Sequence, residues 1–391
     1  MSNDTQPEIR FPGFTEDWEQ RKLGEVVERV TRKNKKLESI RPLTISAQEG
    51  LIDQNEFFNK TVASRDVSGY YLVKKGEFAY NKSYSNGYPW GAVKRLNQYD
   101  MGVLSTLYIV FKPKKIDSDF LEKYYDTTYW YKEVSKHAAE GARNHGLLNI
   151  AASDFFETEI VMPLKIEEQQ KIGAFFKQLD DTIALQQRKL DLLKETKKGF
   201  LQKMFPKNGA KVPEIRFPGF TENWEEKKFK EVINSGIKGK AKAEMSGTKS
   251  LYLDTNYLNG GVVTYVDSPR DVENDDVLIL WDGSQAGTVY YGFSGALGST
   301  LKAYRAKESG AFLYQQLKRN QQIIYDRYRT PNIPHVVKTF TDEFMVSMPS
   351  SEEQFKIGTF FKQLDDTIAL QQRKLDLLKE TKKGFLQKMF V

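Results

Sequence analysis

Side chains that could form a catalytic centre are few and scattered in this chain. The only histidines, His137, His145 and His335, lie far apart in sequence, and no His-Glu-x-x-His motif places two on one helix face. There is no cysteine, which excludes disulfides and cysteine-ligated metal sites. The run GIKGKAK, starting at Gly236, lacks the spacing of a phosphate-binding loop. We therefore expect no catalytic residues and no metal site in this chain.

The segments that organise the chain are two near-identical copies of one 35-residue stretch. Residues 171–205 and 356–390 differ only where Ala174 stands against Thr359. The stretch has no proline and is rich in Leu, Lys, Gln and Glu, which suit a helix interior. A repeat this exact predicts that the same element is built twice.

Apolar residues recur along each copy in alternating steps of three and four, interrupted by Gln186 and Lys197 in the first. This period of 3.5 residues is typical of a coiled coil. The alternative is a long helix buried in an ordinary core, but the opposite face is heavily charged, which favours a single partner helix. The obvious partner is the other copy. The seam consists of Ile172, Phe176, Leu179, Ile183, Leu190, Leu193 and Phe200, and of Ile357, Phe361, Leu364, Ile368, Leu375, Leu378 and Phe385.

The net charge of +7 is concentrated in the repeated helices. Each copy carries eight basic and four acidic residues, which leaves the rest of the chain at −1. The hydrophobic content of 39% is enough for packed cores, and no apolar run approaches the ~20 residues of a membrane span. We expect a cytoplasmic protein.

A second repeat precedes each variable region. The sequence PEIRFPGF occurs at 7–14 and again at 213–220, followed in both places by a similar run containing Trp18 or Trp224. We expect each tryptophan to pin a short amphipathic helix. The predicted segments are leader 1–25, variable region 26–163, long helix 164–205, linker and second leader 206–231, variable region 232–349 and long helix 350–391.

Both variable regions have the pattern of mixed α/β modules with many short strands. Each also contains one aromatic-rich stretch predicted to be helical, at 119–137 and at 311–328. In the first region, a loop and a final strand are expected between that helix and Pro163. The regions share no convincing residue-by-residue identity, which is typical of two modules with different specificities.

The layout resembles the specificity subunit of a type I restriction–modification system. Three features carry the resemblance: the duplicated RFPGFT…W leader, the run MP…EEQ…KIG…F…LD…I from Met162 and again from Met348, and the two dissimilar regions before those runs. It implies an α+β fold in which two mixed α/β target-recognition domains are joined by two long helices. These helices would form an antiparallel coiled coil, with internal pseudo-twofold symmetry.

The resemblance also implies a function. The chain would bind double-stranded DNA, reading a bipartite, asymmetric site, and would itself be non-catalytic. Two modification subunits would methylate adenine with S-adenosylmethionine, and restriction subunits would translocate and cleave DNA with ATP and Mg. No Pro-Pro occurs here, so the Asn- or Asp-Pro-Pro-aromatic run of an amino-methyltransferase is absent. The rival hypothesis is a non-catalytic two-module protein adaptor with a coiled-coil strut.

If the chain binds DNA, polar side chains on exposed turns are the candidate readers of base edges. Ordinary solvated turns have the same composition, so each choice remains open. Basic residues at 29–36 and at Lys238, Lys240 and Lys242 are candidate phosphate grips, with a solvated loop as the alternative in both places. The candidate readers are Lys82, Ser83, Tyr84, Ser85, Asn86, Arg143, Asn144 and His145 in the first region, and Asp282, Ser284, Gln285, Arg327, Arg329, Asn332 and His335 in the second.

Overall fold

Both copies of the 35-residue repeat are helical almost throughout. The computed structural model describes residues 6–46, 48–60, 62–83, 87–137, 148, 150–207 and 209–391. The repeats form most of α6 (Ile166–Lys203) and α11 (Ser351–Lys388), which have 38 residues each. The chain divides into two compact units, unit 1 (Met1–Gln186 and Lys374–Val391) and unit 2 (Gln187–Arg373), so each long helix contributes to both.

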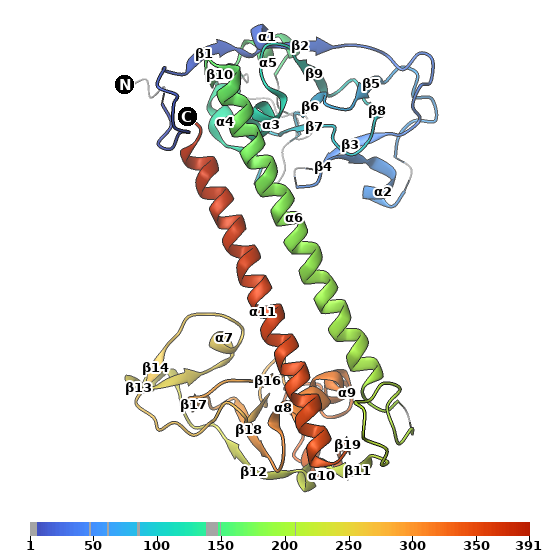
Figure 1. The fold of residues 1–391 in the computed structure, drawn as a ribbon, viewed down its shortest axis with the longest axis vertical. Helices are drawn as coiled ribbons and strands as arrows, with labels where there is room; N and C mark the ends of the chain where they lie inside the picture. The colour runs from blue at the N-terminus through green and yellow to red at the C-terminus, as the bar shows by residue number, and fades with distance from the viewer. Residues whose placement is uncertain are drawn as a thin grey trace. The chain divides into compact units, whose positions relative to one another are not determined.

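The long helices pack antiparallel within each unit (Figure 1). In unit 1 an early residue of α6, Asp180, accepts from Lys382 near the end of α11, with Nζ and Oδ1 2.7 Å apart. In unit 2 the roles are exchanged, because Lys197 near the end of α6 lies 2.5 Å from Asp365 of α11. The predicted seam residues are all buried or half-buried. The predicted antiparallel coiled coil is therefore confirmed.

Unit 1 is built around a four-stranded antiparallel sheet of order β2-β9-β6-β7. Two-stranded pairs β1-β10, β3-β4 and β5-β8 surround it. Its strands are β1 (Glu19–Lys22), β2 (Val27–Val30), β3 (Leu43–Ser46), β4 (Gly50–Asp53), β5 (Tyr71–Lys74), β6 (Phe78–Asn81), β7 (Ala92–Arg95), β8 (Met101–Leu104), β9 (Ile109–Pro113) and β10 (Glu159–Met162). Its shorter helices are α1 (Leu23–Val26), α2 (Gln54–Phe58), α3 (Ser118–Asp126), α4 (Tyr129–His137) and α5 (Ala152–Glu157).

Unit 2 repeats this plan with different residues. Its sheet has the order β12-β18-β15-β16, again antiparallel, beside the pair β11-β19 and the three-stranded β14-β13-β17. The strands are β11 (Glu225–Lys228), β12 (Ile233–Lys238), β13 (Ser246–Leu253), β14 (Tyr265–Val266), β15 (Val277–Leu280), β16 (Val289–Tyr291), β17 (Ala296–Leu297), β18 (Leu301–Ala306) and β19 (Met345–Met348). The helices are η2 (Phe229–Glu231), η3 (Ala243–Met245), α7 (Thr255–Leu258), α8 (Gly310–Arg319), α9 (Gln321–Arg327) and α10 (Phe340–Glu343).

Each unit closes its core around the end of one long helix. In unit 1, Phe390 beyond α11 packs against Trp18, Phe120 and Phe176, with ring centroids 5.4–6.4 Å apart. In unit 2, Phe205 beyond α6 packs in the same way, against Trp224, Phe312 and Phe361, at 5.6–5.9 Å. The duplicated tryptophans are thus core anchors.

The leaders tie the start of one long helix to the end of the other. In unit 1, Arg10 forms two hydrogen bonds with Glu168 of α6, while the Ile9 amide donates to the Lys388 carbonyl of α11 at 2.9 Å. In unit 2, Arg216 binds Glu353 of α11, and the Ile215 amide donates to the Lys203 carbonyl of α6. Each leader therefore bridges both helices.

The structure contradicts several local predictions. No amphipathic helix follows the tryptophans at once; β1 and β11 come first, because their edges pair with β10 and β19, an override of propensity that only the tertiary fold reveals. The helix predicted at 119–137 breaks at Thr127, whose hydroxyl donates to the Tyr124 carbonyl. That predicted at 311–328 breaks at Asn320, whose side chain binds the Gln316 carbonyl. The expected loop before Pro163 also contains α5.

Candidate nucleic-acid interface

In each unit, the loop that follows one central strand meets the segment that precedes the last short helix. After β6, the Lys82 carbonyl accepts a hydrogen bond from the Leu148 amide at 3.0 Å. After β15, the Trp281 carbonyl accepts from the Val336 amide at 2.9 Å. Because β6 and β15 hold the same place in their sheets, these two hydrogen bonds are equivalent. The same junction is thus formed twice by unlike residues.

In unit 1, two of the candidate residues are described, and both are already hydrogen-bonded. The Lys82 ammonium donates to the Ile150 carbonyl at 3.2 Å, and the Ser83 amide donates to Asn81 Oδ1 at 3.0 Å. These contacts hold the start of the loop against the neighbouring segment. Six further candidates, Tyr84, Ser85, Asn86, Arg143, Asn144 and His145, lie outside the described residues.

In unit 2, the structure brings together candidates from two distant stretches of sequence. Asp282 and His335 face each other in an isolated antiparallel bridge, and Arg329 Nη1 donates to the Ser284 carbonyl at 3.1 Å. The Gly283 amide also donates to the Pro334 carbonyl at 2.9 Å. Gly283 has a φ of 119°, which favours glycine, so this turn depends on it.

The loop around Asn332 is held by its own hydrogen bonds. The Thr330 hydroxyl donates to the Ile333 carbonyl, and the His335 amide donates to the Thr330 hydroxyl at 3.1 Å. Asn332 is exposed, and Ile333 keeps 79% of its surface in solvent. A fixed loop that presents an exposed amide and an exposed apolar side chain is suited to contacting another molecule.

Two other candidates in unit 2 differ in their surroundings. Gln285 is exposed in the same turn as Asp282, where its carbonyl accepts from Thr288. Arg327, the last residue of α9, instead lines a cavity of about 310 Å³ together with Asn320 and Glu343. The structure thus places Arg327 apart from the other candidates.

Beside these loops lies a basic cluster that includes only one of the predicted phosphate grips, Lys238. Lys238, the last residue of β12, stands opposite Lys302 of β18, and Lys238 Nζ lies 2.7 Å from Asp282 Oδ2. The Lys302 ammonium sits 3.4 Å from the centre of the Trp281 ring. Its pKa is lowered by burial and by the neighbouring charges of Lys238 and Lys338. The antiparallel register of β12 and β18 brings Lys238 and Lys302 together, and this pairing could not be predicted from the sequence.

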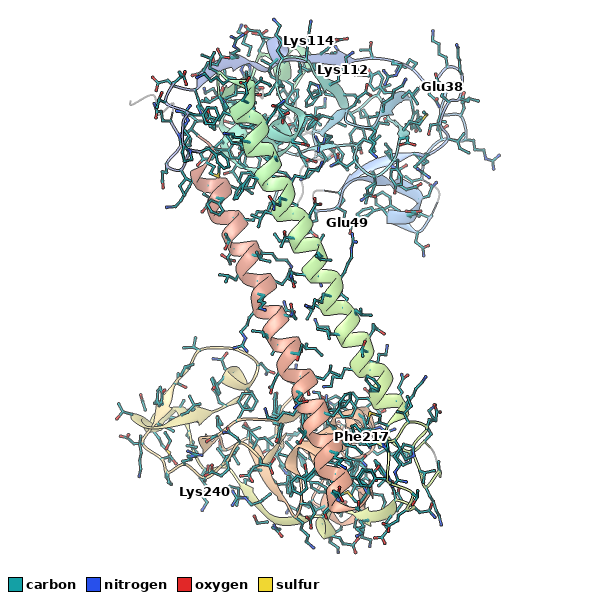
Figure 2. All side chains as sticks on the ribbon, in the orientation of Figure 1. Glu38, Glu49, Lys112, Lys114, Phe217 and Lys240 are labelled. Atoms are coloured by element: carbon teal, nitrogen blue, oxygen red, sulfur yellow. The ribbon has the colours of Figure 1, made fainter. Side chains whose placement is uncertain are left out.

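The other predicted phosphate grips are placed differently. Lys240 (Figure 2) and Lys242 are exposed side chains beyond β12. In the run 29–36, Arg32 donates to Glu77, and Lys33 donates to the Gly69 carbonyl and lies over the Tyr71 ring. These last two cations already have partners within unit 1.

Two features are absent from the described parts of the chain. No group of three or more His, Asp or Glu side chains there is arranged to hold a metal ion. Among the same residues, no helix combines the length and apolar character needed to cross a bilayer.

Comparison with known proteins relates the chain to specificity subunits. The curated type I restriction enzyme MjaVIII specificity subunit of Methanocaldococcus jannaschii is 30% identical over 195 residues, 47% of this chain and 44% of that protein. The putative MjaX specificity subunit of the same organism is 23% identical over 282 residues, 65% of this chain and 63% of that one. The match therefore spans less than two thirds of either relative.

A solved structure and a family model extend the comparison. The crystal structure of the type I restriction–modification S subunit from M. genitalium superposes with a TM-score of 0.67 over 99% of each chain, at 17% identity, which shows a shared fold. The family model of the type I restriction modification DNA specificity domain matches residues 15–195 and again 221–380. Because it matches most of the sequence in both halves, the chain belongs to the type I restriction–modification DNA specificity family.

Proposed function

We propose that this chain is the specificity subunit of a type I restriction–modification system and binds a bipartite, asymmetric DNA site. One observation carries the proposal. The same strand order forms two equivalent junctions from different residues, with Lys82 and Ser83 in unit 1 and Trp281 and Asp282 in unit 2. Two copies of one scaffold with unlike readers are suited to two unlike half-sites.

The long helices act in this proposal as the spacer between the half-sites. A continuous helix of 38 residues has a fixed length of about 57 Å at 1.5 Å per residue. Matched four-residue insertions in α6 and α11 are expected to lengthen the unread gap between half-sites. An unchanged gap in a folded variant would refute the spacer role.

The helices also offer a surface for partner subunits. Leucines seven residues apart remain largely exposed, at 62% and 68% for Leu185 and Leu192 of α6, and at 46% and 67% for Leu370 and Leu377 of α11. Exposed apolar residues at this spacing are suited to helix-in-groove contacts. We assign them to two modification subunits, and we place S-adenosylmethionine, ATP and Mg with those subunits and with the restriction subunits.

The decisive experiment is methylation mapping in cells that express the chain with its modification partners. We expect one bipartite, non-palindromic methylated site, and replacement of region 26–163 or 232–349 should change only one half of it. Random methylation, or methylation of one continuous palindrome, would overturn the proposal.

A protein adaptor remains the second candidate, because the chain outside the helices is close to neutral. A gel shift with mixed genomic DNA separates the two functions. Retention of DNA at low salt, lost steeply as salt increases, supports DNA binding. No retention, even with partners added, supports the adaptor.

A further inference from the structure

Residues 328–337 of unit 2 form a short β-hairpin. The Thr330 amide donates to the His335 carbonyl at 3.0 Å, and the flanking residues Arg329 and Val336 pair in an antiparallel bridge. The tip consists of the four residues between Thr330 and His335, of which the first and the last are prolines. A two-stranded ribbon fits the major groove of B-DNA, which is about 12 Å wide, better than the minor groove of about 6 Å.

The backbone of the tip is held in place, while its one isoleucine remains in solvent. The Ile333 carbonyl accepts from the Thr330 hydroxyl and lies 3.0 Å from Nδ1 of the His335 ring. The prolines on both sides of the tip fix two further φ angles. A single exposed isoleucine is common on protein surfaces. One that is carried on a fixed tip, however, loses little conformational entropy on binding, so Ile333 is suited to contact an apolar group of a ligand.

Positive charge lies around the base of this hairpin. Arg329 belongs to the hairpin, and Lys238 contacts Asp282, which is the bridge partner of His335. Lys302 is the register partner of Lys238. Within the described parts of the chain, neither Lys302 nor Arg329 forms an ion pair with a carboxylate; each lies over an aromatic ring. Cations around an apolar tip favour a polyanion as the ligand, which selects DNA over a protein partner.

We propose that Ile333 packs against the 5-methyl group of a thymine in the major groove, and that unit 2 therefore requires an A·T pair at one position of its half-site. The thymine methyl is an apolar group among hydrogen-bonding base edges, and apolar side chains recognise it by contact. The inference rests on the proposed function and adds to it the identity of one base pair, which backbone contacts do not determine. The sequence of unit 1 differs here, because His145 stands three positions before Leu148, whereas Ile333 stands three before the equivalent residue, Val336.

The test uses the full chain with its modification subunits and duplexes that carry its methylated site. Each thymine of the half-site that depends on region 232–349 is replaced in turn by uracil, which lacks only the 5-methyl group. We expect one of these replacements to weaken binding by the wild type about fourfold, the effect of returning one methyl group to water. The same replacement should leave the affinity of Ile333→Ala unchanged. Replacements in the other half-site should affect the wild type and Ile333→Ala equally.

Val262→Ala is the matched control, because Val262 is also exposed, at 70%, in the segment between α7 and β14 of the same unit. This control should keep the fourfold discrimination of the wild type, and the conservative variant Ile333→Val should keep part of it. Because Ile333 is exposed, Ile333→Ala should have the Tm of the wild type, so its loss of discrimination would not reflect unfolding. Methylation mapping with Ile333→Ala should show additional base pairs accepted at one position of that half-site.

Three results would overturn the inference. If every uracil replacement weakens the wild type and Ile333→Ala by the same factor, Ile333 contacts no thymine methyl. If replacement of guanine by inosine, which changes the minor groove, has an effect that depends on Ile333, the tip lies in that groove instead. If Ile333→Ala weakens binding of the modification subunits and keeps the discrimination, the tip contacts protein. If the wild-type complex methylates no bipartite site, the proposed function itself fails, a result distinct from these three.

Discussion

The ion pair between Arg216 and Glu353 allows a quantitative test of how the leaders hold the long helices. Arg216 Nε and Nη2 each lie 2.7 Å from one carboxylate oxygen of Glu353, in a two-pronged arrangement. The Glu353 side chain is fully buried and that of Arg216 is 14% exposed. Replacing Arg216 with Met leaves a buried carboxylate without its cation, which costs about 3–5 kcal/mol.

The magnitude can be expressed as a melting temperature. Unit 2 spans Gln187–Arg373, and in units of this size 1 kcal/mol corresponds to about 2–4 °C. Arg216→Met should therefore lower the Tm of unit 2 by about 6–20 °C. The double variant Arg216→Met/Glu353→Gln should lose less stability than the sum of the losses in the two single variants, since no buried charge is then left unpaired.

The assay is thermal unfolding followed by circular dichroism, with Lys227→Met as the matched control. Lys227 pairs with Glu225, but their side chains are 44% and 71% exposed, and such surface pairs contribute about 0–1 kcal/mol. If Arg216→Met loses no more stability than Lys227→Met, the leader does not stabilise α11 through this ion pair.

Three further predictions concern packing, pairing and pH. Gly173→Ala should lower the stability by about 1–3 kcal/mol, because the new Cβ would lie 2.7 Å from an atom of α3. Gly199→Ala lies in the same helix, but its Cβ meets open space, so this variant should be about 1 kcal/mol more stable than the wild type. Denaturant midpoints measure both changes. Asp365→Lys removes the charged hydrogen bond to Lys197 and should lower the free energy of unfolding by about 1.5–3 kcal/mol. Adding Lys197→Asp should restore part of that free energy. Equal losses of stability in the single and double variants would contradict the pairing. The pKa of Lys302 is lowered in the folded state, so the unfolded chain binds more protons between that pKa and 10.5. In this pH range, the stability of the wild type should therefore rise with pH relative to that of Lys302→Met. Parallel pH profiles of Tm for the two proteins would contradict this prediction.

The long helices could be predicted because their signal is local and repeated. A heptad pattern sustained through both copies predicts the helix, the seam and the partner, and the charged Lys197 within that seam pairs with Asp365 across it. The loops around Asp282 and Asn332 could also be located, since glycine and polar residues follow apolar strands. These two loops lie next to each other because of the order of the strands in the sheet, and that order could not be predicted from the sequence.

What the sequence could not show depends on register and on distant pairing. Lys302 lies in the strand LKAYRA, and nothing in that run places it opposite Lys238. The residues after Trp18 have no strong strand preference, and only pairing with β10 makes β1 a strand. At the break, the Thr127 hydroxyl donates to the Tyr124 carbonyl in the last turn of α3, a local contact that hydrophobic periodicity does not predict.

The closure of each core around a long-helix end has a consequence during synthesis on the ribosome. Unit 2 is one uninterrupted stretch, and Met204 and Phe205, which close its core, emerge before its other buried core residues. Unit 1 is interrupted, and its core is sealed by Met389 and Phe390. The apolar interior of unit 1 therefore stays partly uncovered until Met389 and Phe390 have been synthesised, whereas the core of unit 2 can close before them.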